Sequence, residues 1–475
     1  MPERPVILWF RRDLRLADNP ALHAACRSGA PVICLYVLDE AAARPFGGAS
    51  RWWLDKSLRS LASSLAAKGA RLELRRGQPV KLIAALARQT NAVAVYFNRA
   101  FDPDGAAKDR GAHEALALAG VETHRFNGSL LVSPDDLRTG EGRPYRVFSA
   151  FWRAASALAG ASACLPEPAA VRPYEGAITT DELGDWALHP TAPDWSHGFV
   201  AWRPGEAGAI ARLQDFLHSA VDDYPERRDR PDLEATSRLS PHLAFGEISP
   251  RQVWECAEAA AHDGASHRGV ELFQKELGWR EFNHHLLHHF PRMTSLNLDR
   301  RFDAFPWASD PAALEAWSHG RTGFPIVDAG MRQLWSSGWM HNRVRMIVAS
   351  FLVKDLLIDW REGEAWFWDT LVDADEANNV GGWQWTAGSG ADAAPYFRVF
   401  NPVLQGVKFD PAGAYVRRWV PELAALPPGC IHTPWTAGPD VLAKADVVLG
   451  RTYPAPIVDH AAARSRALAR FEELR

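Results

Sequence analysis

The pattern of apolar residues changes along the chain, and this change limits the folds that the sequence can adopt. Over about the first 130 residues, short apolar runs alternate with amphipathic stretches, whereas helical spacing dominates from about residue 206 onward. Short apolar runs are typical of buried strands, and their alternation with helices predicts a parallel sheet with helices on both faces. We therefore expect a Rossmann-like α/β N-terminal domain followed by an all-α C-terminal domain.

The strands and helices of the α/β region are defined by their apolar spacing. Leu54, Leu58 and Leu61, for example, recur at helical spacing. The expected strands are Val6–Phe10, Val32–Leu38, Leu72–Leu74, Val93–Phe97 and Val121–Arg125, and the expected helices are Asn19–Ala25, Trp52–Ala67, Val80–Arg88 and Ala106–Ala119.

A connector separates the two patterns. The stretch from about Cys164 to Gly205 is rich in Pro, Gly and Trp and shows little periodicity, which is typical of a long linking segment. We expect domains over residues 1–130 and 206–475, with the connector over 131–205. The helices expected beyond it are Ala209–Ala220, Pro250–Ala261, Glu271–His289, Ile326–Ser336, Met340–Ile358 and Glu364–Leu371.

Several classes of protein are disfavoured by what the sequence lacks. No GxGxxG follows the first strand and no GxxxxGK[ST] occurs, so the α/β domain is not assigned dinucleotide or ATP chemistry. The first apolar run is too short for a signal peptide or a membrane span, and the five cysteines form no CxxC pair. These features predict reduced thiols and a cytoplasmic protein that does not enter a membrane. The net charge of −4 decides little about nucleic acid, because basic residues can gather on one face.

Tryptophan is unusually frequent, with 20 residues. Its large ring suits either a packed core or a surface for stacking and electron transfer. Composition alone favours the core.

Two segments combine polar groups in a way that suits a bound ligand. Ser240 before Pro241 predicts a helix start, and the hydroxyls and guanidinium of 236–240 suit either an anion or simple capping, of which capping is favoured. The segment from Asp373 to Trp385 carries acids, amides, glycines and aromatic rings. It suits a ring system with hydrogen-bond donors and acceptors, although solvated loop acids are the alternative.

Charged and aromatic residues on two further helices admit a binding or a purely structural role. Arg345 could pair with Asp373 and Arg343 could meet a phosphate, but a solvated helix start is the more common role of single arginines and is favoured from these residues alone. Glu276, Trp279 and Arg280 share a helix face, which suits a base or a sugar-phosphate, or equally an intrahelical ion pair.

A group of histidines raises the question of a metal site. The residues are His284, His285, His288 and His289, whose i, i+4 spacing allows ligation, but no HExxH and no third ligand type accompany them. Partly buried helix histidines are favoured, and we predict no metal.

Four segments taken together resemble the photolyase/cryptochrome family. Residues 9–22 are similar to the family's N-terminal signature. The segment 224–240 is similar to its FAD phosphate loop through Tyr224, Arg228, Asp229 and Pro231. Two further segments are similar to its C-terminal signatures, namely Trp339-Met-His-Asn-Arg and Gly382-Trp-Gln-Trp. The likeness covers nearly the whole chain in the right order. Within the family the chain resembles bacterial cyclobutane pyrimidine dimer photolyases of class I or class III, which the sequence does not separate.

The resemblance implies FAD, reduced and anionic in the active form, in the C-terminal domain. Asn379 would face the flavin N5, where an amide suits a reduced flavin and where family light receptors often carry Asp or Cys. Trp383, Trp360 and Trp307 would relay electrons from the surface. The implied FAD-binding residues are Tyr224, Thr236, Ser237, Arg238, Leu239, Ser240, Phe273, Arg345, Asp373, Ala374, Asp375 and Asn379.

The resemblance also implies the substrate, ultraviolet-damaged DNA, duplex or single-stranded, with the dimer flipped out of the helix. Glu276 would hydrogen-bond the dimer and act with Asn379 and the relay tryptophans in catalysis. Family enzymes that repair (6-4) photoproducts carry histidines at the positions of Asn342 and Met346, which favours cyclobutane dimers here. The implied DNA-binding or dimer-binding residues are Glu276, Trp279, Arg280, Asn283, Asn342, Arg343, Met346, Trp385 and Arg398.

The N-terminal domain would bind an antenna chromophore, with 5,10-methenyltetrahydrofolate as first choice and a deazaflavin as alternative. The segment Asn98–Gly105 departs from the Asn-Glu pair of many folate-binding members. The protein is expected to be a monomer. A blue-light-sensing cryptochrome without repair activity is the alternative function, disfavoured because such proteins usually carry a long tail and this chain stops at Arg475.

Overall fold

The computed structural model describes residues 3–160, 163–393 and 397–474. The chain divides into two compact units. We call Met1–Asp194, Val200–Asp222 and Ser237–Pro291 the sheet unit, and Trp195–Phe199, Asp223–Thr236 and Arg292–Arg475 the helical unit.

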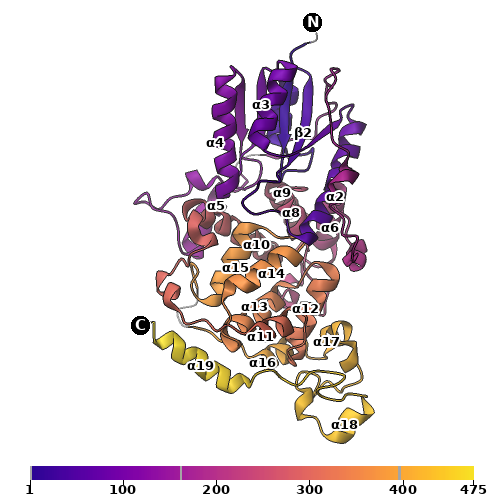
Figure 1. Ribbon diagram of the computed structural model, residues 1–475, viewed down its shortest axis with the longest axis vertical. Helices are drawn as coiled ribbons and strands as arrows, with labels where there is room; N and C mark the ends of the chain where they lie inside the picture. The colour runs from indigo at the N-terminus through magenta and orange to yellow at the C-terminus, as the bar shows by residue number, and fades with distance from the viewer. Residues whose placement is uncertain (1–2, 161–162, 394–396, 475) are drawn as a thin grey trace. The chain divides into compact units, whose positions relative to one another are not determined.

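The sheet unit is built on a five-stranded parallel sheet in the order β3-β2-β1-β4-β5. From β1 the chain first adds β2 and β3 on one side and then β4 and β5 on the other, as in doubly wound α/β folds. All five expected strands and the four helices between them are confirmed (Figure 1). The strands are β1 Val6–Phe10, β2 Val32–Leu38, β3 Leu72–Arg76, β4 Ala94–Asn98 and β5 Glu122–Phe126, and the helices are α1 Pro20–Arg27, α2 Gly48–Ala67, α3 Pro79–Thr90 and α4 Pro103–Leu118.

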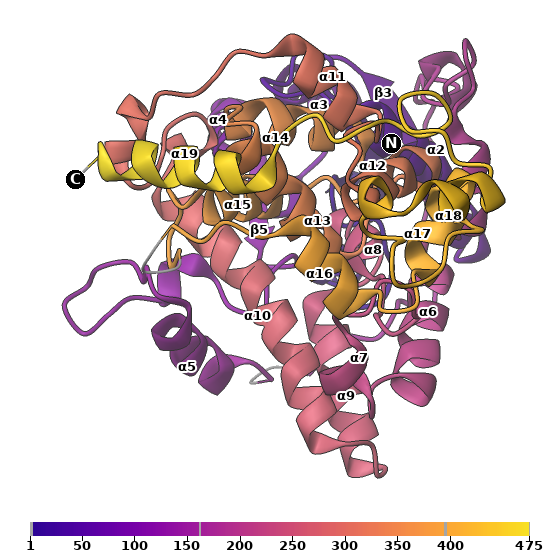
Figure 2. The same ribbon diagram turned by 90° about the horizontal axis from the view of Figure 1, so that it is seen from below.

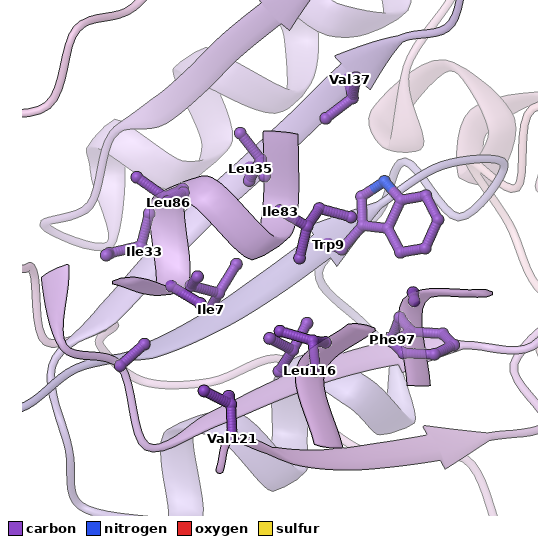
Figure 3. Close-up of a cluster of buried hydrophobic side chains, with 14 residues drawn as sticks. Ile7, Trp9, Ile33, Leu35, Val37, Ile83, Leu86, Phe97, Leu116 and Val121 are labelled. Atoms are coloured by element: carbon purple, nitrogen blue, oxygen red, sulfur yellow. The ribbon is translucent and has the colours of Figure 1, made fainter. Parts of the chain in front are cut away.

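The core of this unit lies where alternate side chains of the sheet meet α3 and α4. Ile7 and Trp9 from β1 point to the same face as Ile33 and Leu35 from β2, because side chains alternate along a strand (Figure 3). Leu116 of α4 packs into the same cluster. Every residue of β1 is buried, which requires cover on both faces and explains its uninterrupted apolar run.

Helices complete the sheet unit. One of them, α5, falls inside the segment that was expected to be a connector. They are α5 Phe148–Leu158, α6 Glu206–Ser219, α8 Ser240–Ala244, α9 Pro250–His262 and α10 His267–His289.

A buried polar network joins the loop after β1 to the turn between α8 and α9. Arg15 is 1% exposed and donates to the carbonyls of Asp18, Gly128 and Gly246. The carboxylate of Asp18 accepts from Arg251 at 3.0 Å. A buried guanidinium is stable only when its N–H donors are hydrogen-bonded. Arg15 and Asp18, in the loop after β1, therefore hold that loop against the α8–α9 turn, and we call this network the Arg15 brace.

The helical unit contains no strand among its described residues, as the all-α prediction requires. Figure 2 shows its helices from the end that carries α19. They are α7 Tyr224–Arg227, α11 Pro311–Ser318, α12 Pro325–Ser337, α13 Asn342–Ser350, α14 Trp360–Thr370, α15 Glu376–Ala387, α16 Pro402–Phe409, α17 Ala414–Trp419, α18 Pro439–Lys444 and α19 His460–Glu472, besides short 3₁₀ turns. None of the helices in the described parts of either unit is long and apolar enough to span a membrane.

The prediction of one regular helix over Met340–Ile358 is wrong. The helix α13 starts at Asn342, where His341 accepts from the backbone of Arg343, and gives way to a π-helical turn, η6, over Phe351–Asp355. There the hydrogen bonds widen, so that Leu356 N donates to the Phe351 carbonyl at 3.0 Å. Apolar spacing does not distinguish this turn from an α-helix.

Gly246 offers a test of the Arg15 brace. Its φ is +65°, and an added Cβ would lie 2.1 Å from the Arg12 carbonyl oxygen and 2.6 Å from the Asp13 Cα. We expect Gly246→Ala to cost about 1 kcal/mol for the left-handed backbone and a further 1–3 kcal/mol for the displaced loop. The measurement is the thermal unfolding midpoint.

Gly120→Ala is the matched control, because Gly120 has a φ of +68° and nothing within 4 Å of an added Cβ. Equal losses in the two variants would show that the close approach to the β1 loop contributes nothing.

Candidate functional site

In the sheet unit, one face of α10 presents three of the expected substrate residues together with Phe273, which is expected to bind FAD. Phe273, Glu276, Arg280 and Asn283 follow one another at spacings of three or four residues. Phe273 is buried and packs on Phe216 with ring centroids 4.6 Å apart.

Trp279 and Arg280 are fixed by neighbours within the sheet unit. Trp279 stacks on Phe148 at 3.8 Å with an interplanar angle of 5°, so its orientation is set by α5. Arg280 donates to the Ser129 carbonyl and to Glu281, each at 3.0 Å. The aromatic and cationic groups of this face are therefore held in place by the protein itself.

The turn before α8 differs by one residue from the expectation. Leu239 has helical angles and occupies the N-cap position, so Ser240 is the first helical residue rather than the cap. Arg238 takes a left-handed φ of +50°. Such a conformation costs a non-glycine residue of the order of 1 kcal/mol and is found most often where a turn serves a site.

The histidines of α10 behave as helix residues packed against the chain. His285 is fully buried, and its Nε2 accepts from the Tyr145 backbone N at 3.1 Å. Burial lowers the pKa of His285 to about 3, so the ring is neutral at neutral pH. The described residues contain no group of three or more His, Cys, Asp or Glu arranged to hold a metal ion.

In the helical unit, Arg345 and Asp373 form the ion pair that the sequence left open. Arg345 donates to the Asp373 carboxylate at 2.7 Å and to the Met340 carbonyl at 2.8 Å. Asp373 is 7% exposed, and a carboxylate at that depth requires such a partner. The pair links the start of α13 to the loop before α15.

The other residues at the start of α13 lie near the surface. Asn342 is exposed and Met346 half-buried, one turn apart on the same side. Arg343 pairs with Asp229 at 2.7 Å and lies 4.6 Å from the Phe409 ring centroid. Arg343 therefore carries a carboxylate partner, and its contact with a phosphate stays a prediction.

The next helix, α15, is capped by one predicted residue and presents another. Asp375 accepts from the backbone N of Asn378 at 2.9 Å, which fixes the helix start. Asn379 donates from Nδ2 to the Glu364 carboxylate at 2.7 Å and to the Glu364 carbonyl at 3.0 Å. With both amide hydrogens used, the carbonyl oxygen of Asn379 is the atom left to accept from a ligand.

The same face of α15 has room for a flat ring. Gly382 lies three residues after Asn379 and is exposed, and an added Cβ there would meet nothing within 4 Å. Tyr224, at the start of α7, is buried and lies 5.3 Å from the Arg228 guanidinium. An acceptor amide, an ion pair and an open helix face suit a planar heterocycle such as a flavin.

Of the three relay tryptophans, the one expected to be outermost is the most exposed. Trp383 and Trp360 are buried, whereas Trp307 is half-buried and packs on Phe305 at 4.3 Å. Trp360 Nε1 donates to Asn297 at 2.9 Å. An added Cβ at Gly363 would lie 2.1 Å from Trp383, so this ring rests directly on α14, one turn from Trp360.

Sequence reasoning missed Glu364 and Gly363. Both act through contacts between α14 and α15, and no local pattern marks such contacts. Trp385 is half-buried, Ala374 is buried and Arg398 is exposed, and their proposed roles remain predictions.

Comparison with known proteins identifies the family. Residues 273–473 match the FAD binding domain of DNA photolyase, and residues 6–171 match the DNA photolyase domain. The chain is 51% identical over 98% of its length to a deoxyribodipyrimidine photo-lyase of Agrobacterium fabrum, covering 97% of that protein. It is 39% identical to cryptochrome-2 of Arabidopsis thaliana, covering 99% of this chain and 80% of the relative.

A solved structure gives the same result. A bacterial class III photolyase from Agrobacterium tumefaciens matches with a TM-score of 0.97 and 50% identity, over 100% of this chain and 98% of that one. The chain therefore belongs to the photolyase/cryptochrome family and carries its FAD-binding domain, as the sequence motifs predicted.

The contact of Trp383 with α14 yields a test of the electron relay. Gly363→Ala should displace the Trp383 ring, because the added methyl would overlap it. We expect slower photoreduction of oxidised FAD, measured by flavin absorption under continuous blue light. Trp307→Phe, which removes the outermost ring, should also slow photoreduction, while enzyme reduced chemically beforehand keeps its activity in both variants.

Glu362→Ala, at an exposed position of the same helix, serves as control. A Gly363→Ala protein that binds FAD and photoreduces at the wild-type rate would argue against this packing as part of the relay.

Proposed function

We propose that the protein is a light-dependent DNA repair enzyme that splits cyclobutane pyrimidine dimers, with FAD as its chromophore. The relative from Agrobacterium fabrum bears the name of that activity. The observation in this chain that carries the proposal is the fixed orientation of Asn379, whose amide nitrogen is held by Glu364.

The orientation of Asn379 suits a reduced flavin. The N5 atom of a reduced flavin carries a hydrogen, whereas that of an oxidised flavin has only a lone pair. A carbonyl oxygen fixed toward N5 therefore accepts a hydrogen bond from the reduced form and repels the oxidised form. It also adds no charge next to an anionic ring. This favours an electron donor over a light sensor that rests in the oxidised state.

The cofactor would be held by the residues that the family resemblance assigns. Tyr224 and the 236–240 turn would hold its phosphates, and Phe273, Arg345, Ala374, Asp373 and Asp375 would surround the flavin and ribose. FAD held there in reduced form would supply light-driven transfer of one electron to the dimer, and the electron would return once the cyclobutane ring has opened. The chain's own part is to fix these groups, exclude water and hold protons in place.

The damaged base would meet half-buried side chains of α10 and exposed or half-buried side chains of α13. Trp279, fixed by its stack on Phe148, offers a flat surface for a thymine, with Trp385 as the second. In its protonated form, Glu276 would donate a hydrogen bond to the dimer carbonyls, where charge accumulates once the electron arrives. Met346 would pack on the dimer, and Arg280, Asn283, Asn342, Arg343 and Arg398 would bind the strand, mostly at phosphates. Photolyases are among the enzymes that flip their target base out of the duplex, because the reacting atoms cannot be reached inside it.

The class and the second chromophore complete the proposal. The 50% identity to the bacterial class III photolyase from Agrobacterium tumefaciens favours class III over class I. In the sheet unit an antenna would collect light, with 5,10-methenyltetrahydrofolate as first choice and a deazaflavin as alternative. The protein would act as a monomer on duplex or single-stranded DNA with the dimer flipped out.

A repair assay tests the function. The purified protein, reduced and loaded with FAD, is mixed with ultraviolet-irradiated DNA, and the loss of dimers is measured under blue light and in darkness. Loss under light alone supports the proposal. FAD-loaded protein that changes no dimers under light would instead favour the cryptochrome alternative.

Glu276 should set the efficiency of repair rather than the affinity for DNA. A hydrogen bond to a charged group contributes about 1.5–3 kcal/mol, so Glu276→Ala should lower the quantum yield at least about twofold by destabilising the dimer radical anion. Binding of damaged DNA should change much less.

Glu271→Ala makes the same substitution at an exposed position of α10 and should leave the yield intact. An unchanged yield in Glu276→Ala would remove the proposed role.

A further inference from the structure

We propose that Lys354 is a positioning residue for DNA binding, which holds the backbone of Phe397–Phe400 so that Arg398 faces the damaged strand. The inference rests on the proposed function, because the contact of Arg398 with DNA is part of it. Lys354 itself lies inside the helical unit and touches no substrate.

The side chain of Lys354 is almost completely buried, which is rare for a lysine. It is 4% exposed, and its Nζ donates to the Arg398 carbonyl. The same Nζ lies 4.6 Å from the centroid of the Phe397 ring. Burial of an ammonium group is costly, and a carbonyl together with an aromatic face offsets part of that cost. Both of these partners belong to the segment that carries Arg398.

A second contact holds the same segment. The backbone N of Phe400 donates to Ser350 Oγ at 3.2 Å. Ser350 and Lys354 lie four residues apart on one helical stretch, so two neighbouring side chains bind the backbone on either side of Val399.

The segment exposes one long side chain between two buried rings. Phe397 and Phe400 are buried, whereas Arg398 is exposed with its guanidinium 4.9 Å from the Phe400 ring centroid. A backbone held at two points therefore presents one cation outward.

The stretch that provides both contacts also begins with the proposed substrate residues. Asn342 and Met346 lie on α13, which runs directly into the π-helical turn that contains Lys354. Such turns are rare and occur frequently at functional sites. The hydrogen bond from Lys354 thus fixes Arg398 relative to the side chains that would meet the dimer.

The charge on Lys354 changes in the neutral pH range. Burial lowers the pKa of Lys354 to about 7, Asp355 opposes this shift, and Arg398 adds to it. The Asp355 carboxylate accepts from His460 at 2.5 Å, and its backbone carbonyl accepts from Arg466 at 2.6 Å. Below pH 7 the ammonium makes a charge-assisted hydrogen bond to the Arg398 carbonyl and so holds the segment more firmly. Affinity for damaged DNA should therefore rise as pH falls through about 7.

The experiment uses the full chain loaded with FAD and measures the affinity for a dimer-containing oligonucleotide by fluorescence anisotropy between about pH 6 and about pH 8.5. Lys354→Met should weaken binding about tenfold at the acid end and less at the alkaline end, and remove the transition near pH 7. FAD absorption and photoreduction should stay unchanged, since Lys354 is not among the residues proposed to hold FAD or to relay electrons.

Ser350→Ala is the matched control, because it removes the second contact without removing a titratable group. It should weaken binding at every pH and keep the transition. In a double-mutant cycle, Lys354→Met should have little further effect once Arg398→Ala is present, because the two residues act through one segment.

The outcomes separate this inference from the function on which it rests. If Arg398→Ala binds like wild type while repair persists, Arg398 is not a DNA contact and the inference falls with it. If Arg398→Ala weakens binding and Lys354→Met does not, or if the two effects add, Lys354 has no positioning role. If Lys354→Met does not bind FAD, the pH dependence of DNA affinity is compared between wild type and Arg398→Ala instead. The inference is supported if wild type shows a transition near pH 7 and Arg398→Ala does not. It is overturned if wild type shows no transition or if Arg398→Ala keeps it.

Discussion

The two hydrogen bonds from Asn379 to Glu364 decide which atom α15 presents to its ligand. An amide is free to turn by 180° and offer either a donor or an acceptor, and these would favour opposite redox states of a flavin. Glu364 removes that freedom because it accepts both amide hydrogens from within the protein. The chemistry proposed for the site follows from this one orientation.

The contact between α14 and α15 provides that orientation and also places the electron relay. Gly363, next to Glu364, lets the Trp383 ring rest on the backbone of α14, and Trp360 begins the same helix. A side chain at Gly363 would separate the two helices. One close approach therefore fixes both the residue proposed to face the flavin N5 and the tryptophans proposed to supply electrons.

Much of the fold was predictable because its signals are local. The strands of the sheet unit are apolar runs between helices, and the prediction placed each within a few residues of its observed position. The pair of Arg345 and Asp373 could be named from opposite charge alone, but only the structure shows that it forms and that the Asp373 side chain is buried. The identity of the family followed from four motifs in order.

The remaining features depend on contacts that spacing does not encode. Glu364 and Asn379 are 15 residues apart on different helices, so their pairing appears only when the helices pack. The π-helical turn at Lys354 has the apolar pattern of an α-helix, and the N-cap at Leu239 violates the preference for a polar cap. In each case tertiary packing outweighs local propensity.

The central claim is that light moves an electron from a reduced flavin held by this chain to a damaged base. The most direct measurement is the fluorescence lifetime of the reduced, FAD-loaded protein, with and without an oligonucleotide that contains a thymine dimer. The account predicts that the dimer shortens the lifetime and that an undamaged oligonucleotide of the same sequence does not. Equal lifetimes at saturating concentrations of the two oligonucleotides would contradict it.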